Sequence, residues 1–184
     1  FGFYFASLDV RQDSRNHDYV WSQILDTCSG KGLTISFADF LKLSHKEQID
    51  YLLSLRLSLG EHKFEDPFVE DTLNSIRAIA AIQTSNGVTG SHRYIISNCQ
   101  STLHVIEVFT LARLLIGNPE GLKLDIVPLF ETIDDLGHAP DIMHELYSIK
   151  EYHDHVEKRK AHQTIMLGFS DGTKDGGYLR ANWS

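Results

Sequence analysis

Two carboxylates, Glu131 and Asp171, are the residues of this sequence with the clearest chemical potential. Each follows a short apolar run that is expected to be a buried strand, and each begins a polar turn. Because the carboxyl ends of parallel strands lie on one face of an α/β fold, these two side chains are expected to converge on one oxygen-rich site. Hard cations such as Mg²⁺ or Mn²⁺ prefer carboxylate oxygens and keep open positions for substrate. The pair therefore predicts a divalent metal site.

Two basic residues are expected at the same edge. Arg11 follows a third strand-like run, residues 3–10, and Lys174 lies in a glycine-rich turn shortly after the second acid. A guanidinium can hold a phosphate through two parallel hydrogen bonds, and an ammonium can stabilise developing negative charge. In isolation, Arg11 is better explained as a surface residue that pairs with Asp9 or Asp13. Taken with the acids, the two cations predict metal-assisted chemistry on an anionic, phosphorylated substrate.

The other three residues also have structural explanations. Glu131 can help a helix begin, since Thr132 and Asp135 form a capping pattern. Asp171 precedes a glycine, as turn residues often do, and Lys174 can be an ordinary solvated lysine. Under this interpretation the chain is a non-catalytic helical interaction module.

The ten histidines do not predict a metal site. His153 and His155 lie two positions apart in an expected helix, so their side chains point to different faces. Cys28 and Cys99 lack the CxxC partners of zinc sites and are expected to be reduced, half-buried thiols, which favours the cytoplasm. The sequence has no Walker-type loop, GxSxG elbow or GxGxxG motif, which argues against nucleotide hydrolysis, acyl transfer and dinucleotide binding.

The composition is that of an ordinary globular protein. The 184 residues are 42% hydrophobic and 23% charged, which is enough for one domain with a substantial core. The net charge of −8, without any run of lysine and arginine, argues against nucleic-acid binding. No apolar stretch approaches the roughly 18 residues of a membrane span, and the first residues do not form a signal peptide.

Short apolar runs alternate with helical patterns along the chain. Strands are expected at 3–10, 93–97, 122–130 and 164–169, and the first two are separated by a helical insertion at about 14–83. This rhythm predicts a helix-rich α/β fold with about four parallel strands, either half of an eight-stranded barrel or a small open sheet. Half a barrel would leave strand edges exposed, and we expect some self-association as a result.

Both ends of the sequence are abrupt. The first residues are strand-like and apolar, and the last ones stop inside an expected helix. Domain boundaries more often fall in polar, flexible segments. We therefore expect residues 1–184 to be a single piece of the catalytic barrel domain of a longer chain.

Four segments carry a resemblance to a known family. They are LDVRQDS (8–14), YIIS (94–97), VPLFETIDDL (127–136) and GFSDGTKDGG (168–177). In order and spacing they closely resemble segments of bacterial-type phosphoenolpyruvate carboxylase, and the similarity runs along nearly the whole sequence. The segments at 127–136 and 168–177 are specific enough to make chance agreement implausible.

The resemblance implies a protein of helices around a (β/α)8 barrel that converts phosphoenolpyruvate and bicarbonate to oxaloacetate and phosphate, which supplies the tricarboxylic acid cycle. By position, Glu131 and Asp171 match the family's ligands to Mg²⁺ or Mn²⁺. Arg11 matches a residue that binds the substrate phosphate, and Lys174 matches an active-site lysine. The family also implies a homotetramer.

The sequence departs from the family in several places. The family's catalytic histidine belongs to a segment N-terminal to this sequence, and its glycine- and arginine-rich loop follows Ser184. Gly172 and Thr173 stand where the family usually has Ser-Ala, and Gly176 stands where it has Ala, which leaves the metal assignment intact. We therefore expect the 184 residues alone to be inactive. Another Mg²⁺-dependent barrel enzyme acting on an enolate or on phosphoenolpyruvate is the remaining enzymatic alternative.

Overall fold

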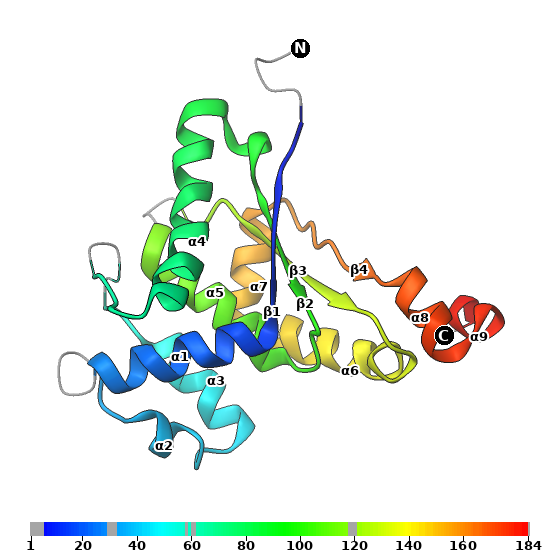
Figure 1. Ribbon diagram of the computed structural model, residues 1–184, viewed down its shortest axis with the longest axis horizontal. Coiled ribbons are helices and arrows are strands. Elements are labelled where there is room, and N and C mark those ends of the chain that lie inside the picture. The colour runs from blue at the N-terminus through cyan, green and yellow to red at the C-terminus, as the bar shows by residue number, and fades with distance from the viewer. Residues whose placement is uncertain (1–5, 29–32, 58, 60–61, 118–120, 184) are drawn as a thin grey trace.

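The chain folds around a sheet of four parallel strands in the order β1-β2-β3-β4 (Figure 1). The computed structural model describes residues 6–28, 33–57, 59, 62–117 and 121–183. The strands are β1 (Asp9–Asp13), β2 (Arg93–Ser97), β3 (Asp125–Phe130) and β4 (Met166–Leu167). Helices connect each pair of neighbours, as parallel pairing requires. The structure confirms a helix-rich α/β fold with four parallel strands, consistent with part of a (β/α)8 barrel.

The helices follow the strands in an uneven distribution. Between β1 and β2 lie α1 (Ser14–Cys28), α2 (Phe37–Phe40), α3 (His45–Ser54), α4 (Pro67–Asn86) and the 3₁₀ turn η1 (Val88–Gly90). The later elements are α5 (Thr102–Ile116) after β2, α6 (Ile133–Ser148) and α7 (Lys150–Lys158) after β3, and α8 (Phe169–Gly176) and α9 (Tyr178–Trp183) after β4. None of the helices in the described ranges is both long and apolar enough to cross a membrane.

Local sequence explains where several helices begin. Ser44 and Glu47 form a capping box at the start of α3, as serine followed three residues later by glutamate favours. Asp66 accepts hydrogen bonds from two backbone N–H groups at the start of α4, and Pro67 occupies the first turn. Each cap satisfies donors that the first turn of a helix leaves unpaired, so these sequences fix the entry points of α3 and α4.

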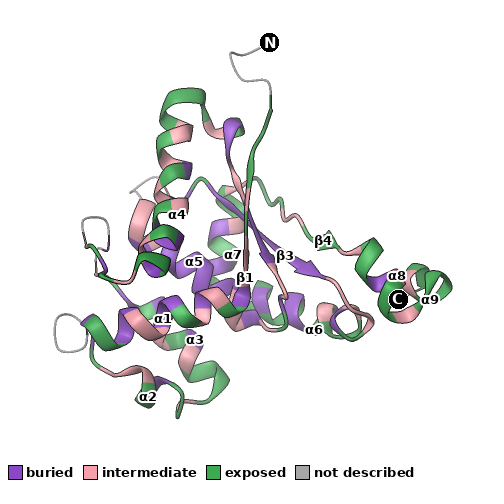
Figure 2. Ribbon diagram, in the orientation of Figure 1, coloured by how far each residue is buried: buried purple, intermediate pink, exposed green. Residues whose placement is uncertain are grey.

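The two faces of the sheet have different surroundings. One face packs against helices that include α1 and α5, and its side chains, among them Tyr94 and Ile96, belong to the main hydrophobic core. Figure 2 shows this buried region on β2, β3 and α5. On the opposite face, Ile95, Val127 and Leu129 form a small separate cluster. The alternation along β2 and β3 thus divides the molecule into a helix-covered face and a second face, which carries the candidate site.

The first strand begins later than the sequence predicts. The expected strand covered 3–10, of which 1–5 lie outside the described residues, whereas β1 spans Asp9–Asp13. It extends to Asp13 because every residue of β1 pairs in parallel with a residue of β2. Arg11 therefore lies within the strand and not after its end, which corrects the expected position of this residue.

The fourth strand is shorter than predicted. The expected strand covered 164–169, but only Met166 and Leu167 pair with β3. The Gly168 N–H then donates to the carbonyl oxygen of Phe130 over 2.8 Å, and Phe169 begins α8. The glycine-rich segment that was expected to be a turn is consequently helical, and Lys174 lies in this helix.

Candidate active site

Arg11 and Glu131 form an ion pair at the carboxyl end of β3. The Arg11 Nη2 atom lies 2.8 Å from Glu131 Oε1, and the two side chains are 52% and 21% exposed. The strand register explains the contact, because Arg11 pairs with Ile95 and Ile95 with Val127, so these side chains share one face. Glu131 follows Val127 by an even number of residues and continues that face. The long arginine side chain spans β2 to reach it.

A backbone N–H group holds the second oxygen of the Glu131 carboxylate. Asn98 N donates to Glu131 Oε2 over 3.1 Å. Asn98 adopts a left-handed conformation with φ of 54°, in the loop that follows β2. The Ser14 hydroxyl donates to the Asn98 carbonyl oxygen over 2.7 Å, which ties this loop to the start of α1. The two oxygens of Glu131 are therefore oriented from β1 and from the loop after β2.

The helix cap after β3 does not use the Glu131 side chain. Thr132 and Asp135 form the capping box of α6, and Asp135 Oδ2 also accepts from the Glu131 N–H over 3.3 Å. The capping pattern is thus present, as its spacing predicts, but Glu131 precedes the cap and directs its carboxylate to Arg11 and Asn98. The cap fixes the Glu131 backbone and leaves the side chain available for another role.

Asp171 lies in the first turn of α8. Its carboxylate is 3.5 Å from the Lys174 ammonium, and both side chains are largely exposed, at 55% and 75%. The helix packs closely on Glu131: a Cβ atom added to Gly168 would lie 3.0 Å from Glu131 Cα, and one added to Gly172 would lie 3.5 Å from the Glu131 carbonyl oxygen. The backbone on both sides of Asp171 thus lies against Glu131, which brings the two acidic segments together.

The four residues singled out from the sequence form two ion pairs, Arg11–Glu131 and Lys174–Asp171. The surface pairing considered for Arg11 is not observed. Instead, Asp13 pairs with Arg15 and Asp9 pairs with Arg93, each over 2.8 Å. Arg11 is therefore left to the acid at the end of β3.

Sequence reasoning missed the groups that orient Glu131. Asn98, Ser14 and Gly168 contact it directly or through one intermediate, yet none carries a chemical motif of its own. A signal was available for Asn98, because asparagine is one of the few residues other than glycine that readily adopts a left-handed conformation after a strand. Its contact with Glu131 depends on the tertiary fold.

Glu131 and Asp171 are the two carboxylates that the sequence predicts as metal ligands. Among the described residues, no group of three or more histidine, cysteine or acidic side chains is placed to hold a metal ion. Each oxygen of Glu131 accepts one hydrogen bond and can accept a further interaction, and Asp171 is open to solvent. Mg²⁺ is commonly held by one or two carboxylates, with water and substrate oxygens as its other ligands, so the donor set fits such an ion.

Two buried titratable groups that follow β1 and β2 are in unsuitable states for proton transfer at neutral pH. Burial raises the pKa of the Cys99 thiol to about 12, so this residue is a protonated thiol beside Asn98. Burial lowers the pKa of His17 to about 3, and its neutral ring bonds to the Tyr94 hydroxyl over 2.9 Å. We therefore assign neither Cys99 nor His17 a role as nucleophile or general acid.

The histidine pair of α7 does not form a chelating site. His153 is exposed, whereas His155 is buried and packs on Phe109 with a ring separation of 5.1 Å. Burial lowers the pKa of His155 to about 4. The two side chains point to different surroundings, which confirms the expectation from their spacing.

Comparison with known proteins places the whole chain in one family. The family model for phosphoenolpyruvate carboxylase matches residues 1–184. The chain is 34% identical over 194 residues to the phosphoenolpyruvate carboxylase of Nitrosomonas europaea and 33% identical over 190 residues to that of Gloeobacter violaceus. Both matches cover 100% of this chain and 20% of the relative, so the chain spans about a fifth of the length of these relatives. The chain belongs to the phosphoenolpyruvate carboxylase family.

Proposed function

We propose that this chain supplies part of the active site of a phosphoenolpyruvate carboxylase, which forms oxaloacetate and phosphate from phosphoenolpyruvate and bicarbonate. The observation that carries the proposal is the Arg11–Glu131 ion pair, together with the close packing of α8 on Glu131. These contacts gather a guanidinium and two acidic segments from three separate parts of the chain. Such a cluster suits a substrate that carries a phosphate and a carboxylate.

Glu131 and Asp171 are the residues that would hold a Mg²⁺ or Mn²⁺ ion. When bound, the ion would polarise the oxygens of phosphoenolpyruvate and stabilise the negative charge that develops on the enolate. Glu131 would offer a carboxylate in a fixed orientation, since Arg11 and the Asn98 N–H each hold one of its oxygens. The role of Asp171 is to offer a carboxylate that no strong hydrogen bond occupies, because its ion pair with Lys174 is long at 3.5 Å.

Arg11 is suited to bind the substrate phosphate. Within the described residues, its only hydrogen bond is the one from Nη2 to Glu131, which leaves its other N–H groups for a ligand. The side chain is 52% exposed, so an anion can reach it. Binding would place the phosphate beside Glu131, where the positive guanidinium attracts the negative phosphate oxygens.

Lys174 would orient bicarbonate or the carboxylate of the substrate. Its ammonium is 75% exposed and is held beside Asp171 in the same helix, so it can move towards bicarbonate or towards the carboxylate of the substrate. A mobile ammonium at this position would also stabilise negative charge that develops when the carbon–carbon bond forms. This residue is an electrostatic contributor and not a proton carrier in the proposal.

The whole enzyme needs more than these residues. We propose that residues 1–184 form one continuous piece of the catalytic barrel domain, with the helices at about 14–83 inserted after its first strand, and that the piece is inactive by itself. The chain covers only 20% of the length of the relatives it matches, which supports this view. The buried cysteines Cys28 and Cys99 support a location in a reducing compartment such as the cytoplasm. The homotetramer is proposed from the family alone.

The test replaces the two acids in the complete polypeptide that carries these residues. Glu131→Gln and Asp171→Asn are expected to lower oxaloacetate formation by orders of magnitude, because both groups organise the transition state. Glu157→Gln, an exposed acid of α7, serves as the control. Activity that stays near wild type in both site variants would favour the interaction-module alternative. Activity without bicarbonate or without phosphate release would point to a different barrel enzyme.

A further inference from the structure

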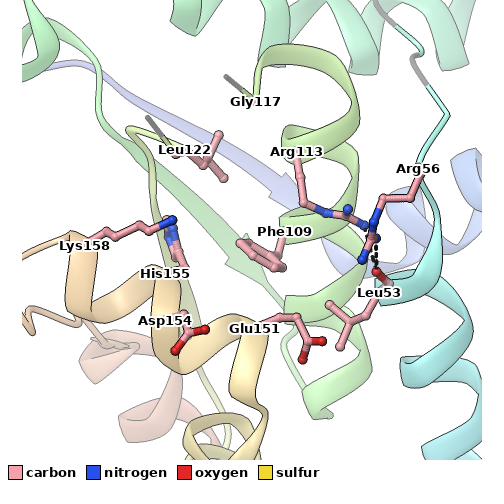
Figure 3. A pocket seen from close by; sticks show the side chains of 11 residues that line it. Leu53, Arg56, Phe109, Arg113, Gly117, Leu122, Glu151, Asp154, His155 and Lys158 are labelled. Carbon is pink, nitrogen blue, oxygen red and sulfur yellow. Dashed lines mark hydrogen bonds between the residues drawn. The ribbon is translucent and has the colours of Figure 1, made fainter. Parts of the chain in front are cut away.

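A second site of a different kind lies on the helix-covered side of the sheet. A cavity of about 890 Å³ opens between the end of α3, the second half of α5 and α7 (Figure 3). We call it the arginine cavity and define it by Arg56, Phe109, Arg113, Glu151 and Lys158. Its volume falls in the range of roughly 300–1,000 Å³ that is usual for sites of small organic ligands.

The arginine cavity is separate from the candidate active site. α5 begins at Thr102, just after the carboxyl end of β2, and runs back along the sheet, so Phe109 and Arg113 lie towards the opposite end of the strands. His155, which also lines the cavity, bonds to the backbone of Leu124, immediately before β3. Glu131, in contrast, follows the last residue of β3. The two sites therefore lie at opposite ends of the sheet.

Two guanidinium groups share one wall of the cavity. Arg56 Nη1 donates to the carbonyl oxygens of Leu53 and Leu55 over 2.6 and 2.9 Å, and Arg113 Nη2 donates to those of Leu52 and Leu53 over 3.3 Å each. These bonds fix both side chains at the end of α3. They use one nitrogen of each guanidinium, and the Nε atom of Arg113 is buried without a partner in the described part of the chain.

Glu151 acts on Arg113 through its charge but forms no salt bridge with it in the described part of the chain. Among the described residues, neither Arg56 nor Arg113 forms a salt bridge with a carboxylate. Burial, followed by the proximity of Arg56, lowers the pKa of Arg113. Two cations held together in this way repel each other, and a bound anion would relieve that repulsion.

The remaining charges of the cavity leave it positive. Lys158 reaches in from the wall opposite the arginines, as Figure 3 shows, and Glu151 lies between the two walls. The carboxylate of Asp154 is already bonded to Lys150. Among the described lining residues, three cations thus face the carboxylate of Glu151, which forms no salt bridge there, and this leaves an excess of positive charge for a ligand to balance. A phosphate monoester carries about −1.5 to −2 at pH 7 and matches that excess.

The floor of the cavity is apolar and rigid. The Phe109 ring lies between the two charged walls and is only 5% exposed. It packs edge-on against Tyr152 at a ring separation of 5.5 Å, which fixes its orientation. A flat or aliphatic group could rest on this ring while an attached anion reaches the arginines.

We propose that the arginine cavity binds a small phosphate monoester with an apolar body, whose phosphate lies on Arg56 and Arg113 and whose body lies on Phe109. This inference does not depend on the proposed carboxylase activity, because it uses none of the residues of that site.

The test measures the binding of phenyl phosphate to the complete polypeptide by isothermal titration calorimetry. Inorganic phosphate and phenol represent the two halves of this probe. Phenyl phosphate is expected to bind at least roughly tenfold more tightly than either half, because it alone engages both the guanidinium pair and the aromatic floor. Equal affinities for phenyl phosphate and inorganic phosphate would overturn the assignment of the floor.

Substitutions assign the binding event to the cavity. Arg56→Gln is expected to weaken it about tenfold, the usual cost of a charge-assisted hydrogen bond. Glu151→Gln removes the unpaired acid and is expected to strengthen it roughly two- to fivefold, as loss of an exposed charge interaction would. Lys46→Gln, an exposed lysine of α3 outside the cavity, and Arg11→Gln, at the candidate active site, should leave it unchanged.

Two results would overturn the proposal. One is an affinity that is the same in the wild type, Arg56→Gln and Glu151→Gln. The other is loss of binding in Arg11→Gln with retention in Arg56→Gln, which would place the probe at the sheet edge. If circular dichroism shows that Arg56→Gln is unfolded, Glu151→Gln decides alone, and failure of this variant to bind more tightly would refute the site.

Discussion

Gly168 lies so close to Glu131 that a Cβ atom on the glycine would be 3.0 Å from Glu131 Cα and 3.1 Å from Glu131 Cγ. The contact joins the turn between β4 and α8 to the acid at the end of β3. The glycine has φ of −82°, so it is required here for space and not for an unusual backbone conformation. The position of α8, and with it Asp171, thus depends on the absence of a side chain at residue 168.

Gly168→Ala is therefore expected to lower oxaloacetate formation by the complete enzyme at least tenfold, because α8 must move away from Glu131. Overpacking of this kind costs about 1–3 kcal/mol of stability. Gly137→Ala is the matched control, since a Cβ there meets nothing within 4 Å and the residue lies inside α6. That change should stabilise the protein by roughly 0.5–1 kcal/mol without altering activity. Similar kinetics for both variants would contradict the positioning role of Gly168.

Arg11→Lys should raise the KM for phosphoenolpyruvate about ten- to a hundredfold, because an ammonium cannot bond Glu131 and a phosphate with the geometry of a guanidinium. Steady-state kinetics at saturating bicarbonate measure the effect. The control is Arg93→Lys, since Arg93 lies on the same face of the sheet and bonds Asp9 through Nε over 2.8 Å. A comparable rise in KM for both variants would indicate a general loss of sheet stability and not loss of a phosphate contact.

The left-handed conformation of Asn98 predicts a specific order of substitutions. Asn98→Gly retains the backbone N–H that bonds Glu131 and fits φ of 54° easily, whereas Asn98→Val must adopt a conformation that costs about 1–2 kcal/mol for residues with a branched Cβ. Urea unfolding should show the valine variant to be less stable than the glycine variant. At Gln100, which lacks a positive φ, the same two substitutions should not show this order. Equal stabilities at residue 98 would argue against a strained loop there.

Burial of His17 predicts a loss of stability in acid. Its pKa is lowered from 6.5 to about 3 in the folded chain, so the unfolded chain binds more protons between these values. The free energy of unfolding should therefore fall as pH decreases from about 6.5 towards 3. His17→Gln removes this dependence and should flatten the decline in urea midpoint between pH 7 and pH 4.5, while His153→Gln, an exposed control, should not. An unchanged slope in His17→Gln would show that other groups cause the acid sensitivity.

Local sequence patterns were sufficient to predict the position of several helices and strands. β2 has the predicted boundaries, and the capping box of Ser44 and Glu47 begins α3 where the sequence places it. The order of strands and helices also follows the predicted alternation, because apolar runs and helical periods reflect burial directly. These features depend on residues close together in the sequence.

Other features depend on partners that are distant in the sequence. β4 is limited to two residues by its pairing with Leu129 and Phe130, which the apolar run at 164–169 does not reveal. The residues Asp-Gly-Thr-Lys of α8 have a turn-like composition. They are nevertheless helical in the structure, where α8 packs against Glu131 and Ile133. The partner of Arg11 was also beyond local reasoning, since Asp9 and Asp13 are nearer in sequence and are bound by other arginines.

The long insertion between β1 and β2 affects how the candidate site can form. The Arg11–Glu131 contact joins residues 120 positions apart, and β1 must find β2 across the whole of α1–α4. The entropy of closing such a loop is lost before the contacts between the strands repay it, so contacts of this kind slow folding. Arg11, the proposed phosphate ligand, would then dock only after β2 and β3 have assembled. Anion affinity at this edge of the sheet would therefore increase as folding is completed. In partly folded chains, Glu131 would be in place before Arg11 lies beside it.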